Sequence, residues 1–466
     1  MALQLNRREF VRCTTAGMAG VLGTHLVQAA ATSRKPNVIV ILADDMGSAD
    51  AGFNGCRDIP TPHLDSLAKG GVRFVCGYVS HPFCSPTRAG LLTGRYQQRF
   101  GHENNPVYAP RDEKIGLPLD EVTLAQVLRQ AGYVTGIVGK WHLGASPPFH
   151  PMRRGFDEQF GFLGGGHDYF KAGTEEEQRE YFIPIQRNGK PVAESEYLTD
   201  AFSREAAAFV RRHPNKPFFL YLAYNAPHTP HQVREKYLGR FTRIEDAKRR
   251  NYAAMVSAMD DGVGLLLSAL RELNLESDTL IFFLSDNGGV VGEWGHGSRN
   301  DPLRGGKGSV FEGGIRVPFV AQWRGHLPEG KVFDHPVSSL DIFPTAVAAA
   351  GAQLPADRKL DGVNLLPHLL GQTSEAPHER LFWRTGGGSA FAVREGRYKM
   401  LQIAAGGPEL YDLESDLSEK TDLADARRDL VEKMLKAYEQ WNKELMAPRW
   451  GNPAQGKKKD QNLPGK

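Results

Sequence analysis

The segment from Cys84 to Arg95 combines chemically capable side chains with a backbone that restricts their positions. It begins with Cys84-Ser85-Pro86-Thr87-Arg88 and continues with Ala-Gly-Leu-Leu-Thr-Gly-Arg. Pro86 removes a backbone donor and fixes the chain direction, and Arg88 stands where its guanidinium could bind an anion through two hydrogen bonds. A buried free cysteine near the start of a helix is the plain alternative, because cysteine is often buried. The length of the pattern favours a chemical role over that alternative.

A second group of residues offers only oxygen atoms as ligands. Asp44 and Asp45 follow one apolar segment, and Asp286 and Asn287 follow another. Each pair alone could simply cap a following helix. If the pairs converge, however, carboxylates without a counter-charge would repel one another and resist ionisation. A divalent cation removes this conflict, and ligation by oxygen favours Ca²⁺ or Mg²⁺ over zinc. The sequence therefore predicts a hard-cation site.

Basic side chains belong to the same set of motifs. Besides Arg88, these are Lys140, His142, His228 and Lys307. Each has a simpler explanation: the lysines could be solvated surface charges, and most of the 15 histidines are expected to be structural or exposed. Brought together, these groups would neutralise the oxygens of an anion and carry protons. We expect an anionic substrate to be bound by these local charges.

Four short apolar segments would position these groups, because each segment ends in a polar cluster. The segments span residues 37–43, 133–139, 218–224 and 279–285. Continuous apolar runs of this length are typical of strands that are buried on both faces of a parallel sheet. They are separated by helix-like stretches at 119–131, 200–212 and 250–273. Such alternation predicts an α/β fold, in which ligands bind beyond the carboxyl ends of the strands.

Taken together, the motifs resemble the type I sulfatase family of the alkaline phosphatase superfamily. The family signature is Cys-x-Pro-x-Arg followed by Leu-x-Thr-Gly-Arg, and the segment from Cys84 matches it at every fixed position. Further elements typical of the family stand at 139–144 (Gly-Lys-Trp-His-Leu-Gly), 225–230 (with Pro-His-Thr-Pro), 304–307, 311–318, 339–345 and 360–363. The similarity extends from Lys35 to near Gly371, and the overall pattern is similar to arylsulfatases and N-acetylgalactosamine-6-sulfatases.

The resemblance implies an α/β fold with a large, mixed but mostly parallel sheet sandwiched by helices, as in alkaline phosphatase. A smaller C-terminal antiparallel sheet with a helix is expected to follow it. Strand-like pieces between Arg380 and Leu413 and a helix from Ala424 to Leu445 fit that second part. The expected organisation is a signal peptide at 1–31, a catalytic domain at 35–371, a small subdomain at 378–447 and a basic, disordered tail at 448–466.

The resemblance also implies how the cysteine and the acidic residues work. In the family, the cysteine that corresponds to Cys84 is oxidised to Cα-formylglycine, and a hydroxyl of the hydrated aldehyde attacks sulfur. The formylglycine at position 84, with Asp44, Asp45, Asp286 and Asn287, would hold Ca²⁺, and Mg²⁺ is the less favoured ion.

The basic residues have implied roles as well. Arg88 and Lys140 would stabilise the hydrate, and His142 would act as the base when sulfate is released. His228 and Lys307 would bind sulfate and protonate the leaving oxygen. Fixed cations and a divalent metal suit a sulfate ester, because three equatorial oxygens must be neutralised while the S–O bond breaks.

The implied substrate is a sulfated carbohydrate or an aryl sulfate, and the sugar and the sulfated position stay open. Gly164–Phe170 and Gly292–Asp301 could line the mouth of the pocket, although ordinary solvated loops have a similar composition. Two other functions remain open: a phosphate or phosphonate monoester hydrolase on the same fold, and a non-catalytic protein that binds sulfated glycans. Against a two-zinc phosphatase, no aspartate of the sequence is followed four residues later by histidine.

The composition limits the classes of partner. Of the 466 residues, 24% are charged and 41% are hydrophobic, an ordinary balance for a globular protein. The net charge of +3 is too small to indicate nucleic acid or a membrane surface as a partner. Cys56 and Cys76 could form a disulfide in an oxidising compartment or remain two free thiols.

The N-terminal residues resemble a twin-arginine export signal. Asn6-Arg7-Arg8-Glu9-Phe10-Val11 precedes a weakly apolar run from Thr15 to Ala29, and small residues around Ala30 suit cleavage. No other apolar run is expected to reach transmembrane length. The expected location is the periplasm or the extracellular space. The expected protein partners are the twin-arginine export machinery and a formylglycine-generating maturation enzyme.

Overall fold

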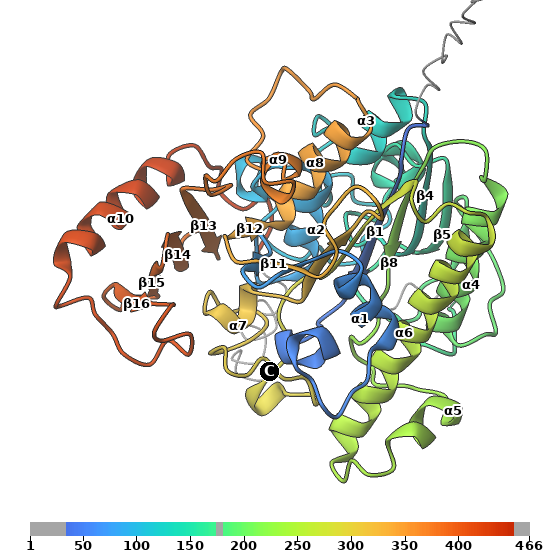
Figure 1. Cartoon of the computed structure of the whole chain (residues 1–466), viewed down its shortest axis with the longest axis horizontal. Helices are drawn as coiled ribbons and strands as arrows, with labels where there is room; N and C mark the ends of the chain where they lie inside the picture. The colour runs from blue at the N-terminus through green and yellow to red at the C-terminus, as the bar shows by residue number, and fades with distance from the viewer. Residues whose placement is uncertain (1–33, 174–179, 452–466) are drawn as a thin grey trace, which may run out of the picture. The chain divides into compact units, whose positions relative to one another are not determined.

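A large mixed sheet forms the centre of the fold (Figure 1). The computed structural model describes residues 34–173 and 180–451. Within them the strands of this sheet lie in the order β11 (Lys331–Phe333), β2 (Val72–Phe74), β10 (Phe319–Gln322), β9 (Thr279–Ser285), β1 (Asn37–Ala43), β8 (Phe218–Ala223), β4 (Val134–Lys140), β5 (Glu158–Phe162), β6 (Gln186–Arg187) and β7 (Lys190–Pro191). The five strands from β9 to β5 are parallel, and β10 and β6 flank them in the antiparallel direction. The expected α/β fold with a mixed, mostly parallel sheet is confirmed.

The predicted strands coincide closely with the observed ones. β1 and β9 have the predicted bounds, whereas β4 is shifted by one residue and β8 ends one residue earlier than predicted. Every residue of β1, β8 and β9 is buried, which explains their continuous apolar composition. Because these strands are parallel, the polar residues that follow them emerge at one edge of the sheet.

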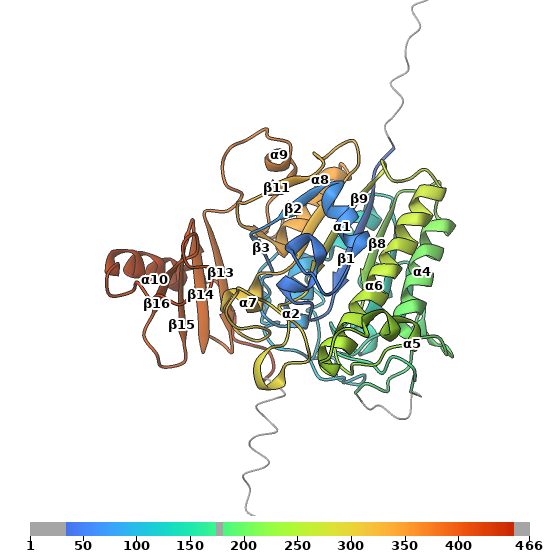
Figure 2. The ribbon, with the colours of Figure 1, turned by 60° about the horizontal axis from the view of Figure 1, so that its bottom comes forward.

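Helices cover both faces of the sheet (Figure 2). One face carries α1 (Pro62–Lys69), α4 (Leu198–Arg212) and α6 (Ala247–Glu272), and the other carries α2 (Cys84–Thr93), α3 (Leu124–Gln130) and α8 (Ile342–Ala349). Alternate residues of β1 enter the two apolar cores. Ile39 and Ile41 join the core under α4 and α6, while Val38, Val40 and Leu42 join the core under α2 and α3.

The helices begin at different residues from those predicted. α3 was expected at 119–131 but begins at Leu124, because Thr123 and Gln126 form a reciprocal capping box. α4 and α6 begin earlier than expected, at Leu198 and Ala247, and Asp246 caps α6. Apolar periodicity therefore located the helices, whereas capping side chains mark the starts of α3 and α6, and α4 begins without a side-chain cap.

α6 corrects the expectation that no run beyond the N-terminal segment reaches transmembrane length. By length and hydropathy alone, it is a helix that could cross a membrane. However, 78% of its most apolar window is buried inside the protein, where it packs against α4 and the sheet. We therefore assign α6 to the core.

The C-terminal part forms the expected small antiparallel sheet. Its strands lie in the order β13 (Arg380–Thr385), β14 (Ala390–Glu395), β15 (Tyr398–Ile403) and β16 (Glu409–Asp412). One face packs on α10 (Arg428–Asn442), which is shorter than the predicted helix, through Tyr438 and Trp441. On the other face Trp383 joins the core of the large sheet and donates its indole N–H to the carbonyl oxygen of Val79 at 2.7 Å.

The remaining strands and α-helices of the described chain are short. They are β3 (Gly77–Tyr78) paired with β12 (Val337–Ser338), and the single turns α5 (Glu235–Leu238), α7 (Glu312–Ile315) and α9 (Leu366–Leu369). Cys56 and Cys76 are free thiols, which settles the choice that the sequence left open. The predicted signal peptide and most of the predicted tail lie outside the described residues.

Candidate active site

The carboxyl ends of β1 and β9 place the oxygen-bearing residues side by side. Ala43 is paired with Ser285, so Asp44–Asp45 and Asp286–Asn287 leave the sheet together. Asn287 Nδ2 donates to Asp45 Oδ1 at 2.7 Å, and the backbone N–H of Asp45 donates to Asp286 Oδ1 at 3.2 Å. All four side chains are buried. The predicted convergence of the two acidic pairs is therefore present.

α2 begins at Cys84 and brings its thiol to the same edge. Pro86 lies in the first turn of α2, where its missing N–H breaks no helical hydrogen bond. Cys84 Sγ lies 3.5 Å from Asp44 Oδ1 and 3.9 Å from Asp45 Oδ1, and the residue is 1% exposed. Burial raises the pKa of the thiol far above its usual value, although nearby lysines oppose the shift. The unmodified thiol is therefore protonated at neutral pH and is a weak nucleophile.

Arg88 lies one helical turn after Cys84 and binds the acidic cluster. Its Nε and Nη2 donate to Asp286 Oδ2 at 2.9 and 2.8 Å, and its Nη1 donates to the carbonyl oxygen of Lys140 at 3.2 Å. Nη2 is also 3.7 Å from Asp44 Oδ2. Burial and the charge of Asp44 raise the pKa of Asp286 to about 6, which Arg88 opposes. Arg88 thus directs its donors to protein groups, and its effect on a substrate would be indirect.

Two lysines contact the aspartates of the cluster, one at each aspartate. Lys140, the last residue of β4, places Nζ 2.5 Å from Asp44 Oδ2. Lys307 places Nζ 2.7 Å from both carboxylate oxygens of Asp45. Although burial would raise the pKa of Asp45, the charges of Lys307 and His228 lower it below its usual value. Both predicted lysines therefore lie at the carboxylates next to Cys84.

His228, which follows β8, faces Asp45 without a hydrogen bond between them. Its Nε2 is 3.7 Å from Asp45 Oδ2, and its Nδ1 is 2.7 Å from the carbonyl oxygen of Thr229. Because a carbonyl oxygen only accepts, Nδ1 carries the proton, and Nε2 of the neutral ring presents a lone pair to Asp45. Burial lowers the pKa of His228 to about 3, so the ring is neutral near pH 7. Two acceptors that face each other in this way suit a shared cation.

His142 lies near the cluster but makes no hydrogen bond or ion pair to it within the described chain. Its backbone N–H donates to the carbonyl oxygen of Leu163 at 3.2 Å, and its ring lies against Gly165. A Cβ atom at Gly165 would come within 2.7 Å of His142 Nε2, so a side chain at residue 165 would displace the His142 ring. Burial, followed by the charge of Lys140, lowers the pKa of His142 well below its usual value.

The described side chains fit a hard cation. One ligand atom from each of Asp44, Asp45, Cys84 and His228 lies within 4.8 Å of the others. Asn287 Oδ1 is buried and has no hydrogen-bond partner among residues 34–173 and 180–451, and a cation would satisfy this acceptor. Asp286, a predicted ligand, lies outside the group of four. Its membership of the ligand set stays a prediction.

Ser85, the residue after Cys84, contacts His102, and the sequence did not identify either of them as part of the site. Ser85 Oγ donates to the carbonyl oxygen of His142 at 2.5 Å and lies 2.6 Å from His102 Nε2. Because the hydroxyl has one proton, His102 Nε2 is the donor in the second contact. These bonds tie the residue after Cys84 to the backbone of His142. No motif marks His102, so only the fold could reveal this link.

Both segments that were expected at the pocket mouth contact the loops of the site. Tyr169 Oη lies 2.6 Å from the carbonyl oxygen of Asn225 and 2.8 Å from that of His228. Asn300 Oδ1 accepts hydrogen bonds from the N–H groups of Gly289 and Ser48 at 3.0 and 3.2 Å. These contacts support the loops after β8, β9 and β1. No contact in the described chain assigns either segment to a substrate.

Two family models match this chain. The model described as Sulfatase matches residues 36–352, which is more than half of the chain. The model described as N-sulphoglucosamine sulphohydrolase, C-terminal, matches residues 306–444. Together the two matches span the large sheet, the cluster around Cys84 and the small C-terminal sheet.

Curated relatives and a solved structure agree with these matches. N-acetylgalactosamine-6-sulfatase of the dog, Canis lupus familiaris, is 37% identical over 401 residues, which cover 81% of this chain and 74% of the relative. Arylsulfatase A of Bos taurus is 37% identical over 456 residues, covering 88% of this chain and 87% of the relative. The crystal structure of Ps i-CgsB is 42% identical with a TM-score of 0.86, covering 92% of this chain and 97% of that one. The chain therefore belongs to the sulfatase family, and it is a sulfuric ester hydrolase, a type I sulfatase of the alkaline phosphatase superfamily.

Proposed function

We propose that this sulfatase removes sulfate from a sulfated carbohydrate, using a formylglycine made from Cys84 and a Ca²⁺ ion held by the adjacent carboxylates. The observation that carries the proposal is the group of Cys84, Asp44, Asp45 and His228, whose ligand atoms lie within 4.8 Å of one another. A nucleophile position beside a cation site, with two lysines in contact, suits displacement at the sulfur of a sulfate ester.

A carbohydrate substrate is supported by what similar proteins bind. Ps i-CgsB was solved in complex with k-i-k-neocarrahexaose, at 42% identity to this chain. The relatives from the dog and several other mammals are named N-acetylgalactosamine-6-sulfatase. We therefore infer a sulfated oligosaccharide as the substrate class. An aryl sulfate is the alternative substrate and is a smaller molecule; the bovine relative is named arylsulfatase A.

The position of each side chain at the site suggests its role in the proposed reaction. Lys140 and Lys307, at Asp44 and Asp45, would bind sulfate oxygens beside residue 84. Lys307 would pass a proton to the leaving oxygen, because Nε2 of neutral His228 carries none; His228 would share this role where the bound anion raises its pKa. His142 would accept a proton when sulfate is released. Formylglycine would supply the hydroxyl that attacks sulfur, and Ca²⁺ would polarise the sulfate.

Maturation and location belong to the proposal as well. Cys84 is 1% exposed in the folded chain, so a formylglycine-generating enzyme would act before folding is complete. The resemblance of Asn6–Val11 to a twin-arginine signal supports export to the periplasm or beyond by the twin-arginine machinery. Folding before export is compatible with a conversion that takes place in the cytoplasm.

The phosphate-ester and glycan-binding alternatives gain no specific support. The ligand group in the described chain contains one histidine, whereas a two-zinc centre is rich in nitrogen ligands. A protein that only binds glycans has no use for a buried thiol placed against two aspartates.

Sulfate release from defined substrates tests the proposal. The purified enzyme would be incubated with para-nitrophenyl sulfate, para-nitrophenyl phosphate, N-acetylgalactosamine-6-sulfate and carrageenan oligosaccharides, and free anions would be quantified by ion chromatography. We expect sulfate from at least one sugar, no sulfate with Cys84→Ala, and unchanged release with Cys56→Ala, a free cysteine outside the cluster. Phosphate release alone, or full activity of Cys84→Ala, would contradict the proposal.

A further inference from the structure

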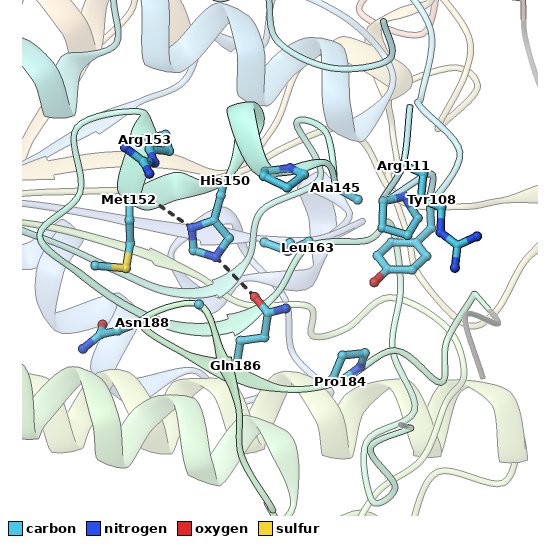
Figure 3. Close-up of a pocket in the computed structure, with 13 residues that line it drawn as sticks. Tyr108, Arg111, Ala145, His150, Met152, Arg153, Leu163, Pro184, Gln186 and Asn188 are labelled. Atoms are coloured by element: carbon cyan, nitrogen blue, oxygen red, sulfur yellow. Dashed lines mark hydrogen bonds between the residues drawn. The ribbon is translucent and has the colours of Figure 1, made fainter. Parts of the chain in front are cut away.

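Figure 3 shows a groove with a basic lining. It has a volume of about 680 Å³ and is formed by segments 108–111, 145–153 and 184–189 together with Leu163. Arg111, His150 and Arg153 belong to its lining, and no aspartate or glutamate does among the residues that the structure describes. The charged groups that line the groove are therefore all positive.

The two arginines have no acidic partner within the described part of the chain. Arg111 and Arg153 are both exposed, and no carboxylate of residues 34–173 or 180–451 lies within 4.0 Å of either guanidinium. Arg240, by contrast, is paired with Asp261 at 2.7 Å on α6. Asp112 and Glu113 follow Arg111 in the chain, and Glu113 lines a second hollow that shares Arg153, but neither forms an ion pair with the two arginines. Two guanidinium groups without a direct carboxylate partner remain able to attract anions.

His150 orients an amide at the centre of the groove (Figure 3). The backbone N–H of Met152 donates to His150 Nδ1 at 3.3 Å, so the neutral ring carries its proton on Nε2. Nε2 then donates to Gln186 Oε1 at 3.2 Å. Burial lowers the pKa of His150, in keeping with a neutral ring. Because the oxygen of Gln186 is occupied, its N–H donors are left for a ligand.

One end of the groove adjoins the active site. Leu163 lines the groove and accepts the backbone N–H of His142, and Gly165 lies against the His142 ring. From there the groove follows β5 to Asn188, whose Oδ1 accepts the N–H of Gln159 at 2.8 Å. Leu163 and Gln159 are four residues apart, a distance of about 13 Å along an extended strand. That length matches a short run of sugar rings.

We propose, on the basis of the carbohydrate sulfatase function proposed above, that this groove binds the non-reacting sugars of a polyanionic oligosaccharide while its scissile sulfate lies at residue 84. Arg111 and Arg153 would each pair with a sulfate or carboxylate group of those sugars, since guanidinium binds such groups through two hydrogen bonds. Gln186 would donate to a sugar oxygen, and the Met152 side chain would contact a ring face.

Binding in the groove would affect affinity and not the chemical step. Contacts that are equal in the ground state and the transition state lower KM and leave kcat unchanged. Because the two arginines are exposed, salt would screen their contribution. The groove would therefore make the enzyme prefer longer, multiply charged substrates at low ionic strength.

Calorimetric titration of Cys84→Ala enzyme, which cannot turn over, tests this groove. The ligands are sulfated hexasaccharides from carrageenan, chondroitin sulfate and heparan sulfate, each with its desulfated counterpart. We expect Arg111→Gln with Arg153→Gln to weaken the best-bound sulfated hexasaccharide by about tenfold at low salt, and by less at high salt. The control is Arg240→Gln with Arg271→Gln, which removes the same amount of charge from two arginines that do not line the groove. It should leave the affinity unchanged.

The outcomes separate the groove from the proposed function. Equal binding by the double variant and its parent, equal binding of desulfated ligands, or no binding of any hexasaccharide would each overturn the assignment of the groove. If the double variant shows the loss but the unmutated enzyme releases no sulfate from any sugar, the groove assignment stands and the proposed reaction fails. An unchanged unfolding midpoint of the double variant excludes misfolding as the cause of a loss.

Discussion

At the scale of single residues, Arg88 neutralises carboxylates of the acidic cluster, a role that the motif alone does not suggest. The sequence named it as an anion-binding group, because an arginine at that spacing from Cys84 is typical of the family. In the fold its guanidinium is wholly buried and donates to Asp286, with Asp44 close by. Residue identity was predictable because the chemistry dictates the residue type. The partner was not, because it depends on how β9 meets α2.

Replacing Arg88 should destabilise the fold strongly. Arg88→Met leaves Asp286 buried without its cation, and the loss of one partner of a buried pair costs about 3–5 kcal/mol of unfolding free energy. Urea denaturation would measure it. The matched control is Arg211→Met, whose exposed pair with Glu272 should contribute less than about 1 kcal/mol. Equal losses in the two variants would show that the buried pair does not hold the cluster.

At the scale of elements, the small C-terminal sheet is joined to the loop that carries Lys307. Lys399 on β15 is fully buried, and its Nζ contacts Glu312 Oε1 at 3.0 Å and Glu419 Oε1 at 2.8 Å. Glu312 is the first residue of α7, five residues after Lys307. The strand-like pieces and the family resemblance predicted β15 and a helix like α10. They could not predict this link, because the three charges are far apart in the chain.

Lys399→Met should therefore reduce both stability and activity. It leaves buried Glu419 without its cation, which costs about 3–5 kcal/mol of unfolding free energy, while Glu312 keeps Arg316. It also loosens the loop of Lys307, so kcat should fall. Lys433→Met, which removes an exposed pair with Glu395, should cost less than about 1 kcal/mol. Unfolding titrations and initial rates give both quantities. An unchanged kcat in Lys399→Met would show that the small sheet does not support the active site through this link.

The entry to α8 provides a prediction about pH. His378 Nε2 lies 2.8 Å from Asp341 Oδ1, and Asp341 caps the turn before α8. Burial lowers the pKa of His378, but Asp341, with a smaller contribution from Asp361, outweighs it and raises the pKa above the usual 6.5. The pair thus contributes its full stability below pH 6.5 and loses it as the pH rises through the folded-state pKa.

The cost of His378→Gln should follow that pH dependence. We expect the loss of unfolding free energy to be larger at pH 6 than at pH 9, because only the protonated ring gains from Asp341. Urea titrations of both proteins at the two pH values would measure it. A loss that is the same at both values, or larger at pH 9, would rule out the protonated pair.

At the scale of the whole molecule, parallel strand order explains why distant motifs meet. Four apolar segments ending in polar clusters were enough to predict that these clusters lie at one edge of the sheet, because parallel strands present their carboxyl ends together. The groove of Arg111 and Arg153 was not predictable, since its lining comes from segments without a motif of their own. The boundary near residue 371 stays a prediction, and the match at 306–444 extends across it.

Removal of the metal should change the stability of the whole chain. An ion that binds only the folded state stabilises it by about 2.7 kcal/mol at a hundred times its Kd. We expect a chelator to lower Tm and added Ca²⁺ to restore it, with a smaller effect of Mg²⁺. Scanning calorimetry would show the shift, and Asp45→Ala should abolish it. A Tm that does not respond to either treatment would argue against a resident cation.

Mass spectrometry of the peptide that contains residue 84, taken from enzyme with measured sulfatase activity, tests the central claim most directly. Conversion of the thiol to an aldehyde lowers the mass of this peptide and makes it reactive toward hydrazide reagents. We predict that the converted fraction rises in proportion to specific activity across preparations. Fully active enzyme in which residue 84 is still an unmodified cysteine would contradict the account.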